Sequence, residues 1–361
     1  MLKRLKEVEK RIKEDGLDGL IVSKGSDIKY LTGFTGEYGV AVLVITPDKN
    51  YFVTDSRFEY QASLEVPDCQ VEVCGSGHGY SFYTRVGEII DKAKAHKVGI
   101  MMDEISHSAY QSLKMKSAGT EYVQSKPYIA NLRMIKDHGE IEIIKKSCNI
   151  SEKSFYALLD RIKPGATEID IANELEYQFR NHGGSGFCFQ TIIASGPDNG
   201  ANCHARPGMR KLQNGDFITI DFGTYYEDYC SDITRTVALG QPKEKELIKI
   251  YKLVKEAKEA AKSVIRKGIS SNEVDSAARS IIEREGYKLP HGLGHGFGLD
   301  IHEPPFFNTY SKSILEAGVI HTIEPGIYVP GVGGVRIEDD YIITENGAEQ
   351  LTNITNELII L

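Results

Sequence analysis

One stretch of alternating apolar and polar residues, Ile218–Thr236, constrains the fold more than any other part of the chain. Its two ends, ITID and ITRTV, have the period of a β-strand, and the polar pair Glu227–Asp228 between them predicts a turn. With the pairing centred on the peptide bond before Glu227, Asp221 lies directly opposite Asp232, where cross-strand Cβ atoms are about 5 Å apart. Two carboxylates this close repel each other unless one is protonated or a cation lies between them. The hairpin therefore favours a cation site.

Composition limits the classes of protein to consider. The 361 residues are enough for two domains, and 41% of them are hydrophobic, which can supply a sizeable core. The net charge of −8, with lysine and arginine dispersed, argues against a nucleic-acid partner. No apolar run is long enough to span a membrane, and the charged N-terminus lacks the apolar core of a signal peptide, so we expect a cytoplasmic protein. The six cysteines contain no CxxC pair and predict free thiols.

The order of predicted elements indicates two domains. An amphipathic helix that ends near Gly16 is followed by alternating short strands and helices as far as residue 123, which predicts a compact α/β domain over residues 1–127. The segment Ser125–Arg133 contains a proline and shows no periodicity, so we place the boundary there. A long amphipathic helix begins near Asp137 and opens a second domain, residues 128–361.

The second domain contains a faint internal repeat with an offset of 103 residues. Each copy has a glycine turn, a serine or threonine that can cap a helix (Thr167; Ser270 or Ser271), an amphipathic helix and a final glycine. The matching pairs are Ile162 and Ile265, Gly165 and Gly268, Ile171 and Val274, Phe179 and Ile282, and Gly183 and Gly286. A second hairpin with two acids, Glu324 and Glu338, follows the second copy. We therefore expect a pseudo-twofold α/β arrangement.

Four hairpin acids and one histidine form the candidate metal site: Asp221, Asp232, His295, Glu324 and Glu338. His295 lies in the loop HGLGHGFGLDIHE, whose glycines lack the register of a phosphate-binding loop ahead of a helix. The alternative is that these glycines allow a close backbone approach that aims His295 at the acids. Four carboxylates and one imidazole suit two divalent cations such as Mn, Co, Zn or Fe. Solvated acids at a sheet rim are the competing interpretation.

These motifs resemble the peptidase M24 family, which includes methionine aminopeptidase, aminopeptidase P, prolidase and creatinase and has the pita-bread fold. The stretches that carry the resemblance are IDFGTYYEDYCSDITRT, HGLGHGFGLDIHEPP, TIEPGIY and GGVRIEDD. The first domain, with IKYLTGFTG and TDSRFEYQA, is similar to the N-terminal domain of aminopeptidase P and prolidase. Methionine aminopeptidases lack that domain, and creatinase lacks the metal ligands. The resemblance therefore implies a metallo-exopeptidase that cleaves Xaa–Pro bonds.

The resemblance also assigns roles to residues. It implies that the five candidate ligands hold two metal ions, manganese first among them, with Asp232 and Glu338 bridging. His204 and His302 match histidines that contact the substrate, and Glu324 is the expected general base for a metal-bridging hydroxide. The expected pocket residues are His291, Arg336 and Tyr328. The remaining histidines, His321 among them, match no motif and are treated as ordinary residues.

Substrate length depends on one position. In many prolidases an arginine stands four residues after the histidine that corresponds to His302, where it can pair with the carboxylate of a dipeptide. Phe306 occupies that position here. We therefore expect aminopeptidase P-like removal of a residue that precedes proline, with strict Xaa-Pro dipeptidase activity and a non-catalytic peptide-binding protein as alternatives. The first domain is expected to mediate a homodimer and to restrict entry to short peptides.

Overall fold

The computed structural model describes residues 2–74 and 82–361. His78, a histidine without a predicted role, lies outside these ranges. The chain divides into two compact units, Met1–Arg133 and Met134–Leu361. Within the described residues, no helix is both long and apolar enough to cross a bilayer.

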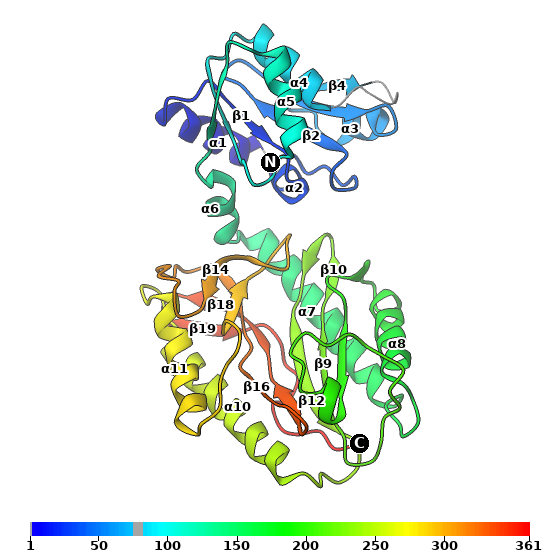
Figure 1. Cartoon of the computed structure of the whole chain (residues 1–361). Helices are drawn as coiled ribbons and strands as arrows, with labels where there is room; N and C mark the ends of the chain where they lie inside the picture. The colour runs from blue at the N-terminus through cyan, green and yellow to red at the C-terminus, as the bar shows by residue number, and fades with distance from the viewer. Residues whose placement is uncertain (1, 75–81) are drawn as a thin grey trace. The chain divides into compact units, whose positions relative to one another are not determined.

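The N-terminal unit is built on a six-stranded mixed sheet with the strand order β4-β3-β2-β1-β5-β6 (Figure 1). Its core is apolar, and the expected first helix buries Leu5, Val8 and Ile12. The expected segment between the domains, which we predicted to lack periodicity, instead contains a short helix, α6. The elements are α1 (Leu2–Glu14), β1 (Gly19–Val22), α2 (Gly25–Thr32), β2 (Ala41–Ile45), β3 (Asn50–Asp55), α3 (Glu59–Glu65), β4 (Gln70–Cys74), α4 (Phe82–Lys92), β5 (Lys97–Ile100), α5 (His107–Lys116), β6 (Glu121–Gln124) and α6 (Tyr128–Met134).

The second unit consists of two αβ halves. Its first half contains α7 (His138–Leu159), α8 (Glu168–Asn181), β7 (Gly186–Phe187), β8 (Ile192–Ser195), α9 (Gly196–Asn199), β9 (Phe217–Phe222), β10 (Thr224–Tyr226), β11 (Tyr229–Cys230) and β12 (Ile233–Ala238). Its second half contains α10 (Lys245–Val264), α11 (Ser271–Arg284), β13 (Gly294–Gly296), β14 (Glu303–Phe307), β15 (Ile320–Ile323), β16 (Gly326–Val329), β17 (Gly333–Arg336), β18 (Asp339–Thr344) and β19 (Gly347–Gln350). Figure 1 shows α7 and α8 beside the first set of strands and α10 and α11 beside the second.

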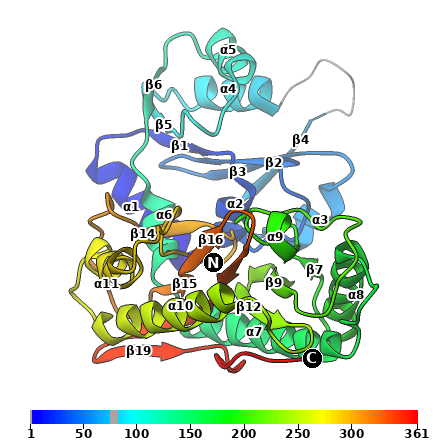
Figure 2. The same ribbon diagram turned by 60° about the horizontal axis from the view of Figure 1, so that its bottom comes forward.

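The internal repeat is present in three dimensions. Thr167 and Ser270 are the N-caps of α8 and α11, and each forms a capping box. Gly165 and Gly268 both have a left-handed φ, of 93° and 84°. Each half also has its own apolar core, and the C-terminal segment returns to the first half, where the N–H of Leu361 donates to the carbonyl of Ala238 at 2.9 Å (Figure 2). The predicted pseudo-twofold arrangement is therefore confirmed.

The register of the first hairpin differs from the prediction by two residues. Asp221 pairs with Thr234, and the same register sets Asp232 opposite Gly223. The turn explains the shift, because Glu227 and Asp228 both adopt a positive φ, as the two central residues of a type I′ turn do. Asp221 and Asp232 remain on one face, but as diagonal neighbours, a relation with a typical separation of about 7–8 Å.

Candidate metal centre

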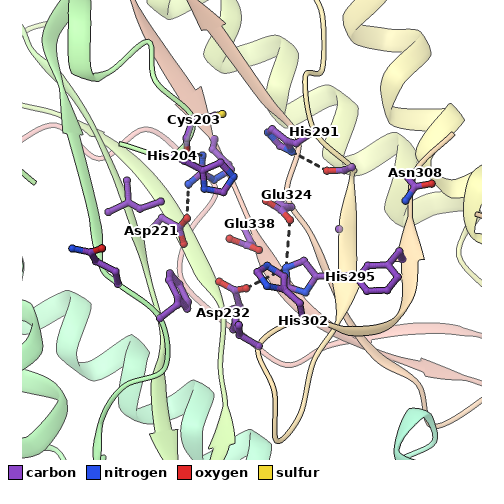
Figure 3. Close-up of a pocket in the computed structure, with 18 residues that line it drawn as sticks. Cys203, His204, Asp221, Asp232, His291, His295, His302, Asn308, Glu324 and Glu338 are labelled. Carbon is purple, nitrogen blue, oxygen red and sulfur yellow. Dashed lines mark hydrogen bonds and ion pairs between the residues drawn. The ribbon is translucent and has the colours of Figure 1, made fainter. Parts of the chain in front are cut away.

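The five predicted ligands converge on one pocket of about 450 Å³ in the second unit. Each comes from the strand region of a hairpin or from β13. Figure 3 shows their side chains directed toward a common centre. The first hairpin supplies Asp221 and Asp232, the second supplies Glu324 and Glu338, and β13 supplies His295.

Distances within this group are short enough for shared coordination. Potential ligand atoms of Asp232, His295 and Glu338 all lie within 4.8 Å of one another. Nε2 of His295 is 3.5 Å from Oδ2 of Asp232 and 3.6 Å from Oε1 of Glu324 (Figure 3). Oδ1 of Asp221 is buried and has no hydrogen-bond partner in the described part of the chain. A buried oxygen without a partner beside three converging ligands fits a cation.

Burial rules out the competing interpretation of solvated acids. Asp221, Asp232 and Glu338 are 8%, 5% and 1% exposed, and the Glu324 side chain is 19% exposed. Burial, and next the charge of Asp221, raises the pKa of Glu338 to about 8. Burial, and next the charge of Glu338, also raises the pKa of Asp232 and of Glu324 well above the usual range. These acids therefore retain protons unless a cation replaces them.

Backbone geometry aims His295 at the acids. Its Nδ1 donates to the carbonyl of Gly296 at 3.1 Å, which leaves the lone pair on Nε2 for a ligand. Burial, and next the neighbouring His302, lowers the pKa of His295 to about 3, so the ring is neutral. A Cβ on Gly294 would lie 2.3 Å from the carbonyl oxygen of Thr322. The glycine therefore permits a close approach of β13 to β15, as predicted, and a phosphate-binding loop is not needed to explain it.

A buried hydrogen-bond chain links the pocket wall to one candidate ligand. Nη2 of Arg336 donates to Oδ2 of Asp221, and Nη1 of Arg336 donates to the Tyr328 hydroxyl at 2.7 Å. The Tyr328 hydroxyl donates in turn to Nε2 of His291 at 3.1 Å, and Nδ1 of His291 donates to the carbonyl of Gly292 at 2.8 Å. Both ring nitrogens of His291 are thus occupied. His291 therefore serves as a wall of the pocket and has no free nitrogen for a substrate.

The two histidines expected to contact the substrate are more accessible. His204 and His302 are exposed and line the same pocket. The His302 ring packs edge-on against His295, with centroids 4.4 Å apart. Partial burial, and next the nearby His204, lowers the pKa of His302, so that it is a neutral hydrogen-bond donor at neutral pH. The structure thus brings together all of the predicted site residues except Tyr328 as pocket-lining residues, and Tyr328 lies directly behind them.

Several residues at the site were missed from the sequence. The hydroxyl of Thr234 donates to Oε2 of Glu338 at 2.6 Å, and Oδ2 of Asp340 accepts from the backbone N–H of Asp232 at 3.1 Å. Asn308 lines the pocket near Phe306. The run of acids Glu338-Asp339-Asp340 was the only sign in the sequence that Asp340 belongs to the site. Its hydrogen bond to Asp232 becomes visible only when the distant strands pair.

Known proteins match this chain along its length. Residues 142–345 match the family model for metallopeptidase family M24, and residues 4–135 match the creatinase/prolidase N-terminal domain. An Xaa-Pro dipeptidase of Pyrococcus furiosus is 36% identical over 99% of this chain and 100% of its own length. A solved Xaa-Pro dipeptidase from Bacillus anthracis is 36% identical with a TM-score of 0.93, covering 100% of this chain and 99% of that one. A solved X-Pro aminopeptidase from Thermotoga maritima is 33% identical with a TM-score of 0.89, covering 99% of both chains.

Proposed function

Because this chain belongs to metallopeptidase family M24 and is a hydrolase with the pita-bread fold, we propose that it cleaves Xaa-Pro dipeptides at the bond before proline. The observation that carries the proposal is the convergence of Asp232, His295 and Glu338 on a pocket in a chain of this family. The dipeptide preference rests on relatives named Xaa-Pro dipeptidase. This preference replaces the aminopeptidase expected from Phe306.

The donor set fits two divalent cations. Four buried carboxylates can neutralise two dications, and hard oxygen donors with one imidazole suit manganese, cobalt, iron or zinc. In the proposed site, Asp221, Asp232, His295, Glu324 and Glu338 would hold the ions, and Asp232 and Glu338 would be the ligands that the two ions share. When bound, such cations supply Lewis-acid activation of water and of the peptide carbonyl. We take manganese as the first candidate.

The protein side chains then position the substrate and move protons. Glu324 is the proposed general base, because its carboxylate lies at the centre of the site beside His295. His302 is neutral and exposed to the pocket, and is proposed to donate a hydrogen bond to the carbonyl oxygen as negative charge develops there. His204 is proposed to contact the substrate from the opposite wall. Arg336 holds Asp221 in place, and Tyr328 and His291 brace Arg336.

A specific feature of the pocket supports recognition of a free C-terminus. Oδ1 of Asn308 accepts from the backbone N–H groups of Tyr310 at 3.0 Å and Ser311 at 2.8 Å. Its amide nitrogen has no partner among the described residues, so that both of its N–H groups are available to a ligand. We propose that this fixed donor holds the proline carboxylate of a dipeptide where Phe306 offers no charge.

Aminopeptidase activity on longer peptides is the second candidate. Phe306 lines the pocket and is 43% exposed, and an apolar wall tolerates a chain that continues beyond proline. The solved X-Pro aminopeptidase from Thermotoga maritima also has the same fold. A homodimer and a cytoplasmic location remain predictions from the sequence.

The test compares kcat/KM for Xaa-Pro and Xaa-Pro-Xaa in the manganese-loaded protein. We expect the dipeptide to be preferred by at least about tenfold, and the isosteric change Asn308→Asp to remove most of that preference by placing a negative charge beside the carboxylate. Phe306→Leu serves as the control, because it keeps the wall apolar. A preference for the tripeptide in the unmodified protein would favour the aminopeptidase. Absence of cleavage of either peptide at every tested metal would reject the proposed function.

A further inference from the structure

Asp340 is a buried carboxylate beside the proposed metal site and is not one of the candidate ligands. It is 0% exposed and lies on β18, two residues after Glu338. Its Oδ2 accepts two hydrogen bonds, from the backbone N–H of Asp232 at 3.1 Å and from Sγ of Cys148 at 3.3 Å. Its other oxygen has no partner within residues 2–74 and 82–361. A carboxylate that is fully buried and has one oxygen without a partner is not accounted for by contact with solvent.

The position of Asp340 is set by the seam between the two halves. At the middle of this seam, the N–H of Glu338 donates to the carbonyl of Thr234 at 3.0 Å. Asp340 is two residues after Glu338 and Asp232 is two residues before Thr234, and these two residues lie next to each other across the seam. The carboxylate of Asp340 thus reaches across the seam to the backbone of a proposed ligand from the other hairpin.

The internal repeat provides an equivalent contact on the opposite flank of the seam. There the N–H of Arg336 donates to Oγ1 of Thr236 at 3.1 Å. The hairpin registers make Thr236 the counterpart of Asp340, and Arg336 the counterpart of Asp232. In both contacts, a side chain of one hairpin accepts a hydrogen bond from a backbone N–H of the other. A threonine hydroxyl is therefore sufficient for this contact.

We propose that Asp340 is a positioning residue that fixes the backbone of Asp232 and thereby aims this carboxylate at the metal. The proposal rests on the proposed metal-dependent function. Without Asp340, the N–H of Asp232 is a buried donor without a partner, and the ligand backbone can move to recover a hydrogen bond. Residues that orient metal ligands in this way typically affect metal affinity by about 10–100-fold.

Two substitutions of nearly equal shape separate this role from simple packing. Asp340→Thr keeps a hydroxyl acceptor, as Thr236 provides on the other flank, whereas Asp340→Val has the same branched shape without an acceptor. Titration calorimetry with Mn²⁺ on metal-stripped full-length protein measures the affinity directly. We expect Asp340→Thr to bind within about threefold of the unmodified protein and Asp340→Val to bind at least about tenfold more weakly.

Controls distinguish the positioning role from general damage. Ser147→Ala removes a different buried hydrogen bond, which lies within the first half and runs from Oγ to the carbonyl of Thr224 at 2.9 Å, and we expect it to leave Mn²⁺ affinity unchanged. Equal affinity of the Thr and Val variants overturns the inference. If the Val variant does not fold, a folded Asp340→Thr variant that has lost tenfold or more in affinity also overturns it. An unmodified protein that binds no divalent cation instead rejects the proposed function itself.

Discussion

The two hairpins of the second unit share a backbone plan but carry their acids at different positions. In the first hairpin, Asp221 and Asp232 are diagonal neighbours across the pair of strands. In the second hairpin, the strand pairs before and after Glu324, β15 with β18 and β16 with β17, share one register. This register places Glu324 directly opposite Glu338. The backbone repeat is therefore nearly symmetric, whereas the placement of the acids is not.

This difference shows how the site reduces repulsion among four buried acids. The position equivalent to Asp232 holds Arg336, which donates to Asp221 of the other hairpin. The position equivalent to Glu338 holds Thr234, which donates to Glu338 across the seam. In each half, one position that holds an acid in the other half is thus occupied by a hydrogen-bond donor. This donor, Arg336 or Thr234, orients an acid of the other half. A fully symmetric set would add charge and lose these two donors.

The strongest test of this asymmetry removes one acid from each hairpin. Asp232→Ala and Glu338→Ala should each lose both metal ions, because each acid is proposed to bridge them, and kcat/KM should fall on the order of 10³-fold. Metal content by elemental analysis and activity on Xaa-Pro measure this. Thr234→Val is the matched variant, since it keeps every acid and loses only the donor to Glu338, and it should cost about tenfold. Two ions per chain in either alanine variant would falsify the bridging assignment.

A smaller effect concerns His321, which occupies the repeat position of Ile218. His321 is fully buried, and burial lowers its pKa to about 4, below the ordinary value of 6.5. The unfolded chain therefore binds a proton that the folded chain rejects, so stability falls as the pH drops from about 6.5 toward 4. His321→Ile, which restores the residue type of the first half, should reduce the loss of unfolding free energy between pH 7 and pH 5 by about 2 kcal/mol.

Urea unfolding of both proteins at the two pH values measures this difference. The control is His107→Gln on the exposed face of α5, which should show the acid sensitivity of the unmodified protein. Equal acid sensitivity of His321→Ile and the unmodified protein would mean that His321 titrates normally in the folded state.

Much of the fold follows from local sequence signals. Thr167 and Ser270 cap helices because their side chains accept backbone N–H groups, and Gly165 and Gly268 occupy positions that require a left-handed φ. The four acids of the candidate site were also predictable, because strand alternation determines which side chains share a face, and His295 was predictable from the glycine-rich loop that carries it.

Other features depend on contacts that a linear pattern does not contain. The predicted register of the first hairpin was wrong by two residues. The turn places Glu227 and Asp228 in left-handed conformations, and neither residue type requires such a conformation. The bond between Asp340 and Asp232 joins residues 108 apart in the chain. The hydrogen bond between Nε2 of His291 and the Tyr328 hydroxyl likewise joins residues 37 apart in the chain.

A last effect is the release of protons, when metal binds, from acids of both hairpins. The pKa of Glu338 is raised to about 8, and that of Asp232 is also raised, so at least one proton must leave when a cation binds at neutral pH. The apparent Mn²⁺ affinity should therefore rise by at least about tenfold per pH unit between pH 6 and pH 7.5, where Glu338 is protonated in the metal-free protein. Calorimetry in buffers with different ionisation enthalpies counts the released protons. Titration of Mn²⁺ into EDTA under the same conditions corrects for the interaction of Mn²⁺ with the buffer. An affinity that does not change with pH would mean that the acids are already ionised without metal, and that the donors Arg336 and Thr234 alone offset their repulsion.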